Sequence, residues 1–262
     1  MKTLLVGKEH IAYKESGQGS TIVLLHGFCG NVDYWDYIVP VLAEKYHVLC
    51  MDLRGHGHSS FQGGDIKIED LAKDIHLVLE KLSIEKVTML GHSLGGYVSL
   101  AFAELYPEKL AGFGLIHSTA FQDTEEGKEG RLHAIKKIQD FGIESFVDGL
   151  VPNLFADDSK SILPKEIEKA KDIGYKTNQV AAMETQAAMR VRPDRNKIIA
   201  DSKVPVLLVK GIKDKIVPLN RVTSSSGSTI TEVELDAGHM SMLEAPEQLA
   251  RTIQSFVEKN IK

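Results

Sequence analysis

The sequence predicts an α/β fold with a mostly parallel sheet, and three observations support this. Five short apolar runs rich in Val, Ile and Leu show no alternation, which is typical of strands buried on both faces. Helical patterns lie between the runs, so strands and helices alternate along the chain. The 262 residues suffice for one α/β domain with a large core. The five runs are Ile22–Leu25, Val48–Met51, Val87–Leu90, Phe113–Ile116 and Val204–Val209.

The remaining elements complete this pattern in chain order. Leu4–Val6 and Ile11–Lys14 predict an antiparallel hairpin at the edge of the sheet. Leu71–Leu82 carries its apolar residues on one helical face, and Leu249–Val257 repeats that spacing near the C-terminus. Thr229–Leu235 predicts one more strand.

Residues 121–200 interrupt the alternation, because they contain several short amphipathic patterns and no convincing strand. The segment is too long for a simple crossover and too short for an independent domain. We therefore expect a helical cap over one edge of the sheet, with residues 1–120 and 201–262 forming the core. The patterns are Leu132–Phe141, Ile143–Phe155, Pro164–Tyr175 and Asn178–Val191.

Composition and charge exclude several classes of function. A formal net charge of −5 gives no reason to expect nucleic acid or an anionic membrane as a partner. No signal peptide and no membrane-spanning stretch is recognisable. Cys29 and Cys50 are interpreted as buried, reduced thiols, although a disulfide between them stays open. We expect a cytoplasmic monomer or homodimer that acts on a small molecule.

The clearest chemical motif is Gly91–Gly96, which reads GHSLGG. It follows the strand at Val87–Leu90 and precedes a helix, so Ser93 would project its hydroxyl above the sheet from a tight turn. The motif alone is weak evidence, and the flanking strand and helix are the context that gives it weight. Ser93 is therefore the candidate nucleophile.

A serine hydroxyl needs a base, and the base needs a carboxylate that fixes its tautomer. His239 follows the strand at Thr229–Leu235, and Asp214 follows the strand at Val204–Val209. The chain order Ser93, Asp214, His239 is the order of one known class of hydrolytic triad. Weaker rivals for the carboxylate are Asp236, Asp123 and Asp52. Histidines interpreted as structural include His10, His47, His76, His117 and His133.

The oxyanion of acyl transfer needs donors that are placed in advance. The backbone N–H of Leu94 is one candidate, and that of Phe28, in the glycine-rich loop after Ile22–Leu25, is the other. Asp52–Ser59 contains two histidines, but the set of ligands that would make a metal site is missing. We interpret it as a loop in which Asp52 and Arg54 hold neighbouring turns. No metal and no cofactor is expected.

Together these motifs resemble the α/β-hydrolase superfamily over essentially the whole chain. The resemblance implies an eight-stranded, mostly parallel sheet, a helical cap between strands six and seven, and the triad assigned above. The matching segments are His26–Phe28, Asp52–Ser59, Gly91–Gly96, Gly211–Pro218 and Gly238–His239.

Departures from family patterns narrow the subfamily. A serine nucleophile is unlike haloalkane dehalogenases and epoxide hydrolases, and the HGF loop is unlike the HGGG type. We expect a carboxylesterase-like enzyme for small or medium esters. A lactonase, a C–C bond hydrolase and a slowly hydrolysing ligand receptor are the alternatives. Arg190 and Arg192 are the only hint of a carboxylate pocket and are interpreted as solvated. Candidate pocket residues are Trp35, Phe28, Phe121, Phe146, Phe155, Met183, Met240 and Met242.

Overall fold

The computed structural model describes residues 1–260 and contains one eight-stranded sheet. Its strands are β1 Lys2–Val6, β2 Glu9–Ser16, β3 Thr21–Leu25, β4 His47–Met51, β5 Val87–His92, β6 Leu110–Ile116, β7 Val206–Gly211 and β8 Ile230–Leu235. They lie in the order β1-β2-β4-β3-β5-β6-β7-β8. β2 pairs antiparallel with β1 and β4, and all pairs from β4 to β8 are parallel. The prediction of a mostly parallel sheet with an edge hairpin is confirmed.

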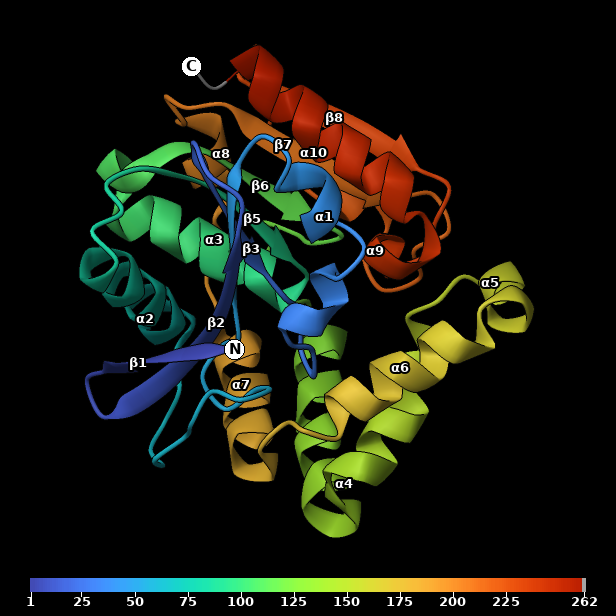
Figure 1. Ribbon diagram of the computed structural model, residues 1–262. Coiled ribbons are helices and arrows are strands. Elements are labelled where there is room, and N and C mark those ends of the chain that lie inside the picture. Colours follow the sequence, from blue (N-terminus) through green and yellow to red (C-terminus); the bar gives the residue numbers. More distant parts are fainter. Residues whose placement is uncertain (261–262) are drawn as a thin grey trace.

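Helices cover both faces of the sheet (Figure 1). α2 and α3 lie on one face, and α1 and α10 lie on the other. The bounds are α1 Val39–Leu42, α2 Ile68–Lys81, α3 Leu94–Leu105, α4 Glu125–Leu150, α5 Asp157–Ile162, α6 Pro164–Gly174, α7 Gln179–Val191, α8 Asn196–Ala200, α9 Ser241–Glu244 and α10 Pro246–Asn260.

Two hydrophobic cores result, one on each face of the sheet. Successive side chains of a strand point to opposite faces, and β7 shows this directly. Leu208 packs with the core under α2 and α3, whereas its neighbour Leu207 packs with the core under α1 and α10. All four residues of Val206–Val209 have no exposed surface. The unbroken apolar runs of the sequence reflect this burial on both sides.

Residues 121–200, called the helical segment below, connect β6 to β7 and contain α4 to α8 without a strand. α4 and α7 pack against each other away from the main body of the sheet (Figure 1). The Thr124 side chain caps α4 by accepting from the N–H of Gly127. Gly142, with φ of +82°, interrupts α4 between the two helical patterns expected there.

The two cysteines, Cys29 and Cys50, are both buried and both free. The expectation of reduced thiols is confirmed, and the alternative of a disulfide between them is wrong. None of the helices in the described part of the chain is both long and apolar enough to cross a membrane.

Candidate active site

The turn around Ser93 is strained and depends on glycine. β5 ends at His92 and α3 begins at Leu94, and Ser93 between them has φ of +50°. This is an unusual conformation for a residue other than glycine. A Cβ at Gly91 would lie 2.0 Å from the carbonyl oxygen of Gly95, so no larger residue fits. The side chain of Ser93 is partly accessible, in contrast to its buried neighbours.

Two hydrogen bonds to the backbone of Ser93 hold it in this conformation. Its N–H donates to the carbonyl of Ile116 at the end of β6 (3.0 Å). Its own carbonyl accepts from the hydroxyl of Ser118 (2.7 Å). Both partners belong to the next strand and its loop, so the neighbouring strand fixes the position of Ser93.

His239 and Asp214 form a buried pair in the loops after β8 and β7. Nδ1 of His239 lies 2.8 Å from Oδ2 of Asp214, and their side chains are 2% and 1% exposed. Oδ1 of Asp214 accepts from the N–H groups of Ile216 (2.7 Å) and Val217 (3.0 Å). Burial acts to raise the pKa of Asp214, but the attraction and hydrogen bond of His239, together with the nearby ring of His117, outweigh it and hold the pKa well below its ordinary value.

His92 joins this pair to the turn that carries Ser93. Nε2 of His92 donates to the backbone carbonyl of His239 (2.8 Å), and the two ring centroids lie 4.9 Å apart. The N–H of His239 in turn donates to the carbonyl of Leu154, which follows α4 (2.8 Å). The structure thus brings the loops of Ser93, Asp214 and His239 to the carboxyl edge of the sheet, where sites in open α/β sheets gather.

The rival carboxylates have other partners. Asp236 is exposed and pairs with Lys213 (2.7 Å). Asp123 pairs with two arginines of the helical segment, Arg131 and Arg192. Asp52 is fully buried and accepts from two backbone N–H groups, those of Val32 and His58. None of the three therefore competes with Asp214 for His239 within residues 1–260.

In the loop after β4, Asp52 holds neighbouring turns as expected, whereas Arg54 contacts a helix. The bonds of Asp52 join the loop after β3 to the loop after β4. Arg54 forms a bidentate pair with Asp74 of α2, with distances of 2.8 and 2.7 Å. Arg54 therefore holds a helix, not a neighbouring turn.

The two proposed oxyanion donors belong to segments next to Ser93. The N–H of Leu94 is the first of α3, at the positive end of the helix dipole. Phe28 is in the loop after β3, next to Gly27, where an added Cβ would lie 3.2 Å from Cβ of Ser93. The ring of Phe28 packs edge-on against Phe146 of α4, with centroids 6.0 Å apart. The loop after β3 thus touches both the serine turn and the helical segment.

A cavity of about 580 Å³ lies between the core and the helical segment, next to the Asp214 loop. Ile216 and Val217, whose N–H groups hold Asp214, form part of its wall. Its charged lining consists of three arginines and one aspartate: Arg131, Arg192, Arg221 and Asp123. The exposed wall of the cavity is mostly apolar, and its charged groups carry an excess of positive charge.

Most of the pocket residues expected from sequence do not line this cavity. Phe146 lines it. Trp35, Phe155 and Met240, at 0%, 1% and 0% exposure, belong to the core under α1 and α10, as does Met242. In this structure these four side chains pack in the core and do not line the cavity, so their role as pocket residues stays a prediction.

Phe121 and Met183 occupy intermediate positions. Phe121 lies beneath the guanidinium of Arg221 (4.6 Å), at the rim of the cavity. Met183 is partly buried against the core. The expectation that Arg192 is solvated is wrong: it is 6% exposed, pairs with Asp123 (2.7 Å) and stacks on the ring of Tyr97.

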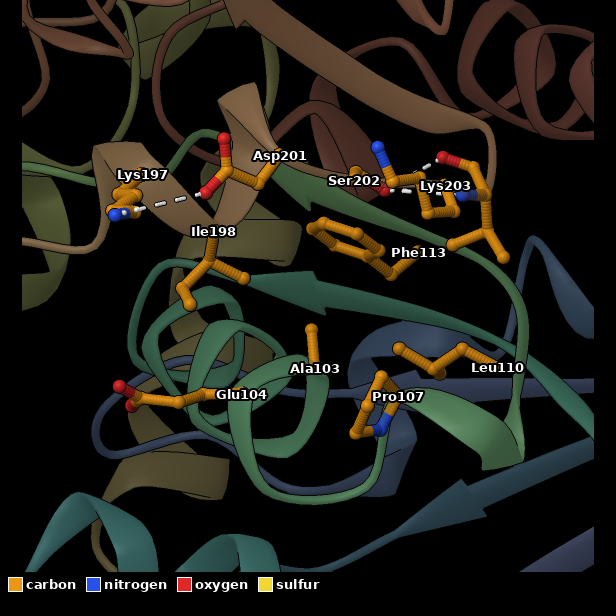
Figure 2. Close-up of a pocket in the computed structure, with 11 residues that line it drawn as sticks. Ala103, Glu104, Pro107, Leu110, Phe113, Lys197, Ile198, Asp201, Ser202 and Lys203 are labelled. Carbon is orange, nitrogen blue, oxygen red and sulfur yellow. Dashed lines mark hydrogen bonds and ion pairs between the residues drawn. The ribbon is translucent and has the colours of Figure 1, made fainter.

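A second cavity, of about 440 Å³, lies at the opposite edge of the sheet (Figure 2). Leu110 and Val204, which line it, are near the amino ends of β6 and β7. It therefore lies far from the carboxyl edge that carries Ser93, and we do not assign a catalytic role to it.

A family model described as the alpha/beta hydrolase fold matches residues 20–246. The chain belongs to this family. The eight-stranded, mostly parallel sheet agrees with it.

Individual proteins are similar to this chain at a moderate level. The dihydrolipoyllysine-residue acetyltransferase component of the acetoin cleaving system of Pseudomonas putida is 29% identical over 95% of the chain, which spans only 66% of that relative's length. Lipase 1 of Psychrobacter immobilis is 28% identical over 96% of the chain and 82% of the lipase. A thermophilic esterase from Thermogutta terrifontis superposes with a TM-score of 0.89 at 27% identity, covering 96% of this chain and 94% of the other.

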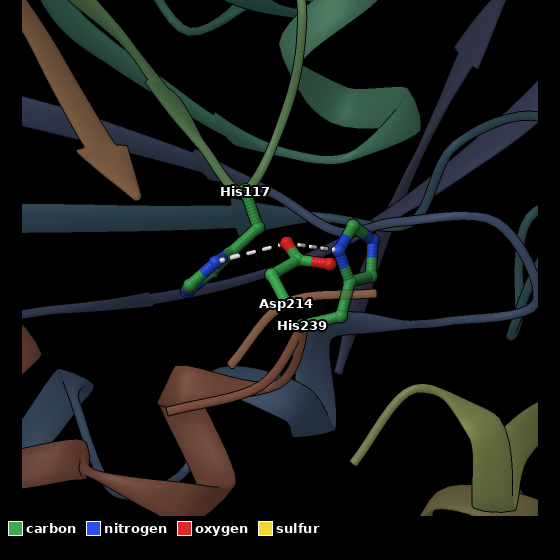
Figure 3. A group of neighbouring side chains, drawn as sticks. All are labelled: His117, Asp214 and His239. Carbon is green, nitrogen blue, oxygen red and sulfur yellow. Dashed lines mark hydrogen bonds and ion pairs between the residues drawn. The ribbon is translucent and has the colours of Figure 1, made fainter. Parts of the chain in front are cut away.

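One residue near the candidate triad of this alpha/beta hydrolase was not recognised from the sequence. His117, interpreted as structural, places Nδ1 3.4 Å from Oδ2 of Asp214 (Figure 3). It follows β6 directly, so its place at the carboxyl edge of the sheet was a signal that could have found it. Its apolar surroundings in the sequence concealed that signal.

His117, Asp214 and His239 form a compact group that a metal could also attract. Two ligands of one tetrahedral zinc ion stand about 3.4 Å apart, given bonds of roughly 2.1 Å. Nδ1 of His239 and Oδ2 of Asp214 are 2.8 Å apart, which is a hydrogen-bond distance. The spacing of His239 and Asp214 therefore fits a shared proton better than a shared metal.

Proposed function

We propose that the protein is a serine hydrolase that cleaves carboxylic esters through Ser93, His239 and Asp214. The observation that carries the proposal is the strained Ser93 at the start of α3, joined through His92 to the buried His239–Asp214 pair. Such a constellation activates a hydroxyl for attack on a carbonyl. The names of the lipase and the esterase among the relatives support the same reaction.

The reaction has two steps. Ser93 attacks the ester carbonyl while His239 takes its proton, and the N–H groups of Phe28 and Leu94 stabilise the oxyanion. His239 then protonates the leaving alcohol, and the acyl group stays on Ser93. A water molecule, deprotonated by His239, releases the acid. Asp214 holds the ring of His239 and stabilises its charged form.

The helical segment acts as a cap that selects the substrate. The cavity next to the Asp214 loop, which neither Ser93 nor His239 lines, would hold the part of the ester that lies away from the reacting bond. A volume of about 580 Å³ suits small or medium substrates. Arg221 has no carboxylate partner among the described residues, and Arg131 shares Asp123 with Arg192. This favours a second candidate, an ester or lactone that carries a carboxylate of its own.

The test begins with fluorophosphonate labelling of the wild type and of Ser93→Ala. We expect covalent labelling of the wild type alone, and turnover of p-nitrophenyl butyrate reduced by roughly four orders of magnitude in the variant. Ser99→Ala removes another hydroxyl from the same helix and serves as the matched control. Full turnover by Ser93→Ala would contradict the assignment.

A substrate panel then separates the candidates. It contains a short ester, a long-chain ester, a simple lactone and a monoester of a dicarboxylic acid. Preference for the monoester, lost in Arg221→Ala, would support the charged substrate. Preference for long chains would contradict the small pocket. Very slow turnover of the whole panel together with tight ligand binding would favour a receptor instead.

A further inference from the structure

The backbone of His239 is hydrogen bonded to other parts of the chain on both sides of its Cα. Its N–H donates to the carbonyl of Leu154 (2.8 Å), and its carbonyl accepts from Nε2 of His92 (2.8 Å). The N–H of the next residue, Met240, donates to Oε1 of Glu244 (3.0 Å). Because a side chain leaves from its backbone, the groups that hold this backbone determine where the imidazole of His239 lies.

Glu244, the last residue of α9, binds on two sides. Its Oε1 accepts from the N–H of Met240, and its own N–H donates to the carbonyl of Met240 (2.9 Å). Its Oε2 accepts from the N–H of Ala156 (2.9 Å) and from the hydroxyl of Ser159 in α5 (2.7 Å). One carboxylate therefore joins the turn after His239 to the start of α5, which belongs to the helical segment.

The packing around this carboxylate is close. A Cβ added at Gly238 would lie 2.5 Å from the backbone nitrogen of Ala156 and 2.9 Å from Oε1 of Glu244. Both distances are shorter than a Cβ tolerates, so no side chain fits between these groups. The turn that carries His239, the start of α5 and Glu244 are therefore in direct contact.

Two ion pairs also reach α5, from the loop after β7 that carries the proposed acid. Lys213 pairs with Asp158 (2.7 Å), and Lys215 pairs with Asp157 (2.5 Å). These four side chains are between 38% and 68% exposed, and ion pairs that are so accessible contribute little because solvent and salt screen them. The partly buried carboxylate of Glu244, with three charge-assisted hydrogen bonds, is the stronger connection.

We propose that Glu244 is a positioning residue, which holds His239 in place by tying its backbone to the helical segment. Leu150, at the end of α4, lines the cavity, and Leu154, four residues later, accepts from the N–H of His239. The wall of the cavity and the proposed base are thus connected through a short stretch of chain and through Glu244. The effect on the reaction rate rests on the proposed hydrolase function, whereas the effect on the backbone bonds does not.

The kinetic test is fluorophosphonate labelling at a series of probe concentrations, which separates the limiting rate of labelling from the affinity for the probe. In Glu244→Ala we expect the limiting rate to fall roughly tenfold, because a less well oriented base removes the proton of Ser93 less efficiently. The affinity for the probe should stay unchanged, because Glu244 does not line the cavity. Glu247→Ala removes a neighbouring carboxylate that is 85% exposed, and it serves as the matched control.

Two milder variants separate the two sides of the contact. Glu244→Gln keeps one acceptor oxygen where the carboxylate has two, so its limiting rate should lie between those of the wild type and Glu244→Ala. Ser159→Ala removes one donor on the α5 side and leaves the turn of His239 as it is, so it should cause a smaller fall. An unchanged rate in Ser159→Ala would contradict the part of the proposal that concerns the helical segment.

Hydrogen exchange of single amides, followed by NMR, tests the same bonds without a substrate. In Glu244→Ala we expect the amides of Met240 and Ala156 to exchange at least roughly tenfold faster, because each loses its acceptor. The amide of His239, which Glu244 does not contact, should follow them. The amide of Phe113 in β6, which donates to the carbonyl of Pro205, is the reference and should not change.

The outcomes are distinguishable. Equal acceleration at Phe113 and His239 would mean a general loss of stability and would overturn the positioning role. Unchanged exchange at His239, or an unchanged limiting rate of labelling in Glu244→Ala, would also overturn it. If the fluorophosphonate does not label the wild type, the proposed hydrolase function fails, and hydrogen exchange still decides whether Glu244 holds the backbone of His239.

Discussion

His26, at the end of β3, is a buried histidine whose two ring nitrogens have different fixed roles. Nε2 accepts from the N–H of Leu53 (2.9 Å), so Nδ1 carries the proton and donates to the carbonyl of Gly27 (2.7 Å). Burial lowers the pKa of His26 to about 4. A second proton would break the bond to Leu53 and charge a dry site. The neutral ring joins the loop of Phe28 to the loop after β4.

This arrangement predicts acid sensitivity with a definite sign. The unfolded chain binds a proton at His26 near pH 6.5 and the fold only near pH 4, so stability falls as the pH drops between these values. The loss is about 1.4 kcal/mol per pH unit for one such histidine. Urea unfolding of the wild type and His26→Asn at several pH values measures it. The variant should show the shallower slope, and the exposed His133→Asn is the control. If stability depended equally steeply on pH in the wild type and in His26→Asn, His26 would not be the cause of the acid sensitivity.

At the level of single residues, only part of the candidate site could be predicted from the sequence. Ser93, Asp214 and His239 follow predicted strands, so the parallel sheet alone brings their loops to one edge. The distance of 3.4 Å between His117 and Asp214 results from tertiary packing, which no local pattern encodes. The buried state of Trp35 and Met240 was equally hidden, because apolar residues suit a core and a pocket alike.

At the scale of elements, α4 is two helices joined at Gly142. The sequence predicted two patterns, ending at Phe141 and starting at Ile143, and the structure places the break between them. A Cβ at Gly142 would meet only the side-chain oxygen of Gln179, at 3.7 Å, so the requirement for glycine is conformational. Two glycines of the same helix therefore allow a matched comparison.

Gly142→Ala should lower the free energy of unfolding by about 1 kcal/mol, because alanine is strained at φ of +82°. Gly130→Ala lies in the first half of α4, where an added Cβ meets nothing within 4 Å. It should raise stability by up to about 1 kcal/mol through helix propensity. Chemical denaturation of both variants checks the opposite signs. A loss of stability in Gly130→Ala, or none in Gly142→Ala, contradicts the argument.

At the scale of the whole molecule, one sheet separates the two hydrophobic cores, and we expect the two cores to unfold together. Trp35, the single tryptophan of the chain, is buried in the core under α1 and α10. Leu208 is buried in the core on the other face. Fluorescence of Trp35 therefore reports on one face, and circular dichroism reports on the helices of both.

Leu208→Ala should destabilise the protein by about 2 to 5 kcal/mol, the usual effect of a large cavity in a core. If the protein unfolds as one unit, the midpoints by fluorescence and by circular dichroism should shift together. Leu207→Ala, on the Trp35 side of the same strand, is the matched variant. If Leu208→Ala left the midpoint of unfolding by fluorescence unchanged, the two faces of the sheet would unfold separately.

The contact between Phe28 and Phe146 has a consequence for how such an enzyme could diversify. The residue proposed to hold the oxyanion packs against the segment proposed to choose the substrate, with ring centroids 6.0 Å apart. Any change of sequence that moves α4 to admit a new ester would also move the loop that we propose to stabilise the transition state. Selection for a new substrate would then act on the rate of the reaction at the same time, so substitutions at Phe146 should be recovered together with compensating ones around Phe28.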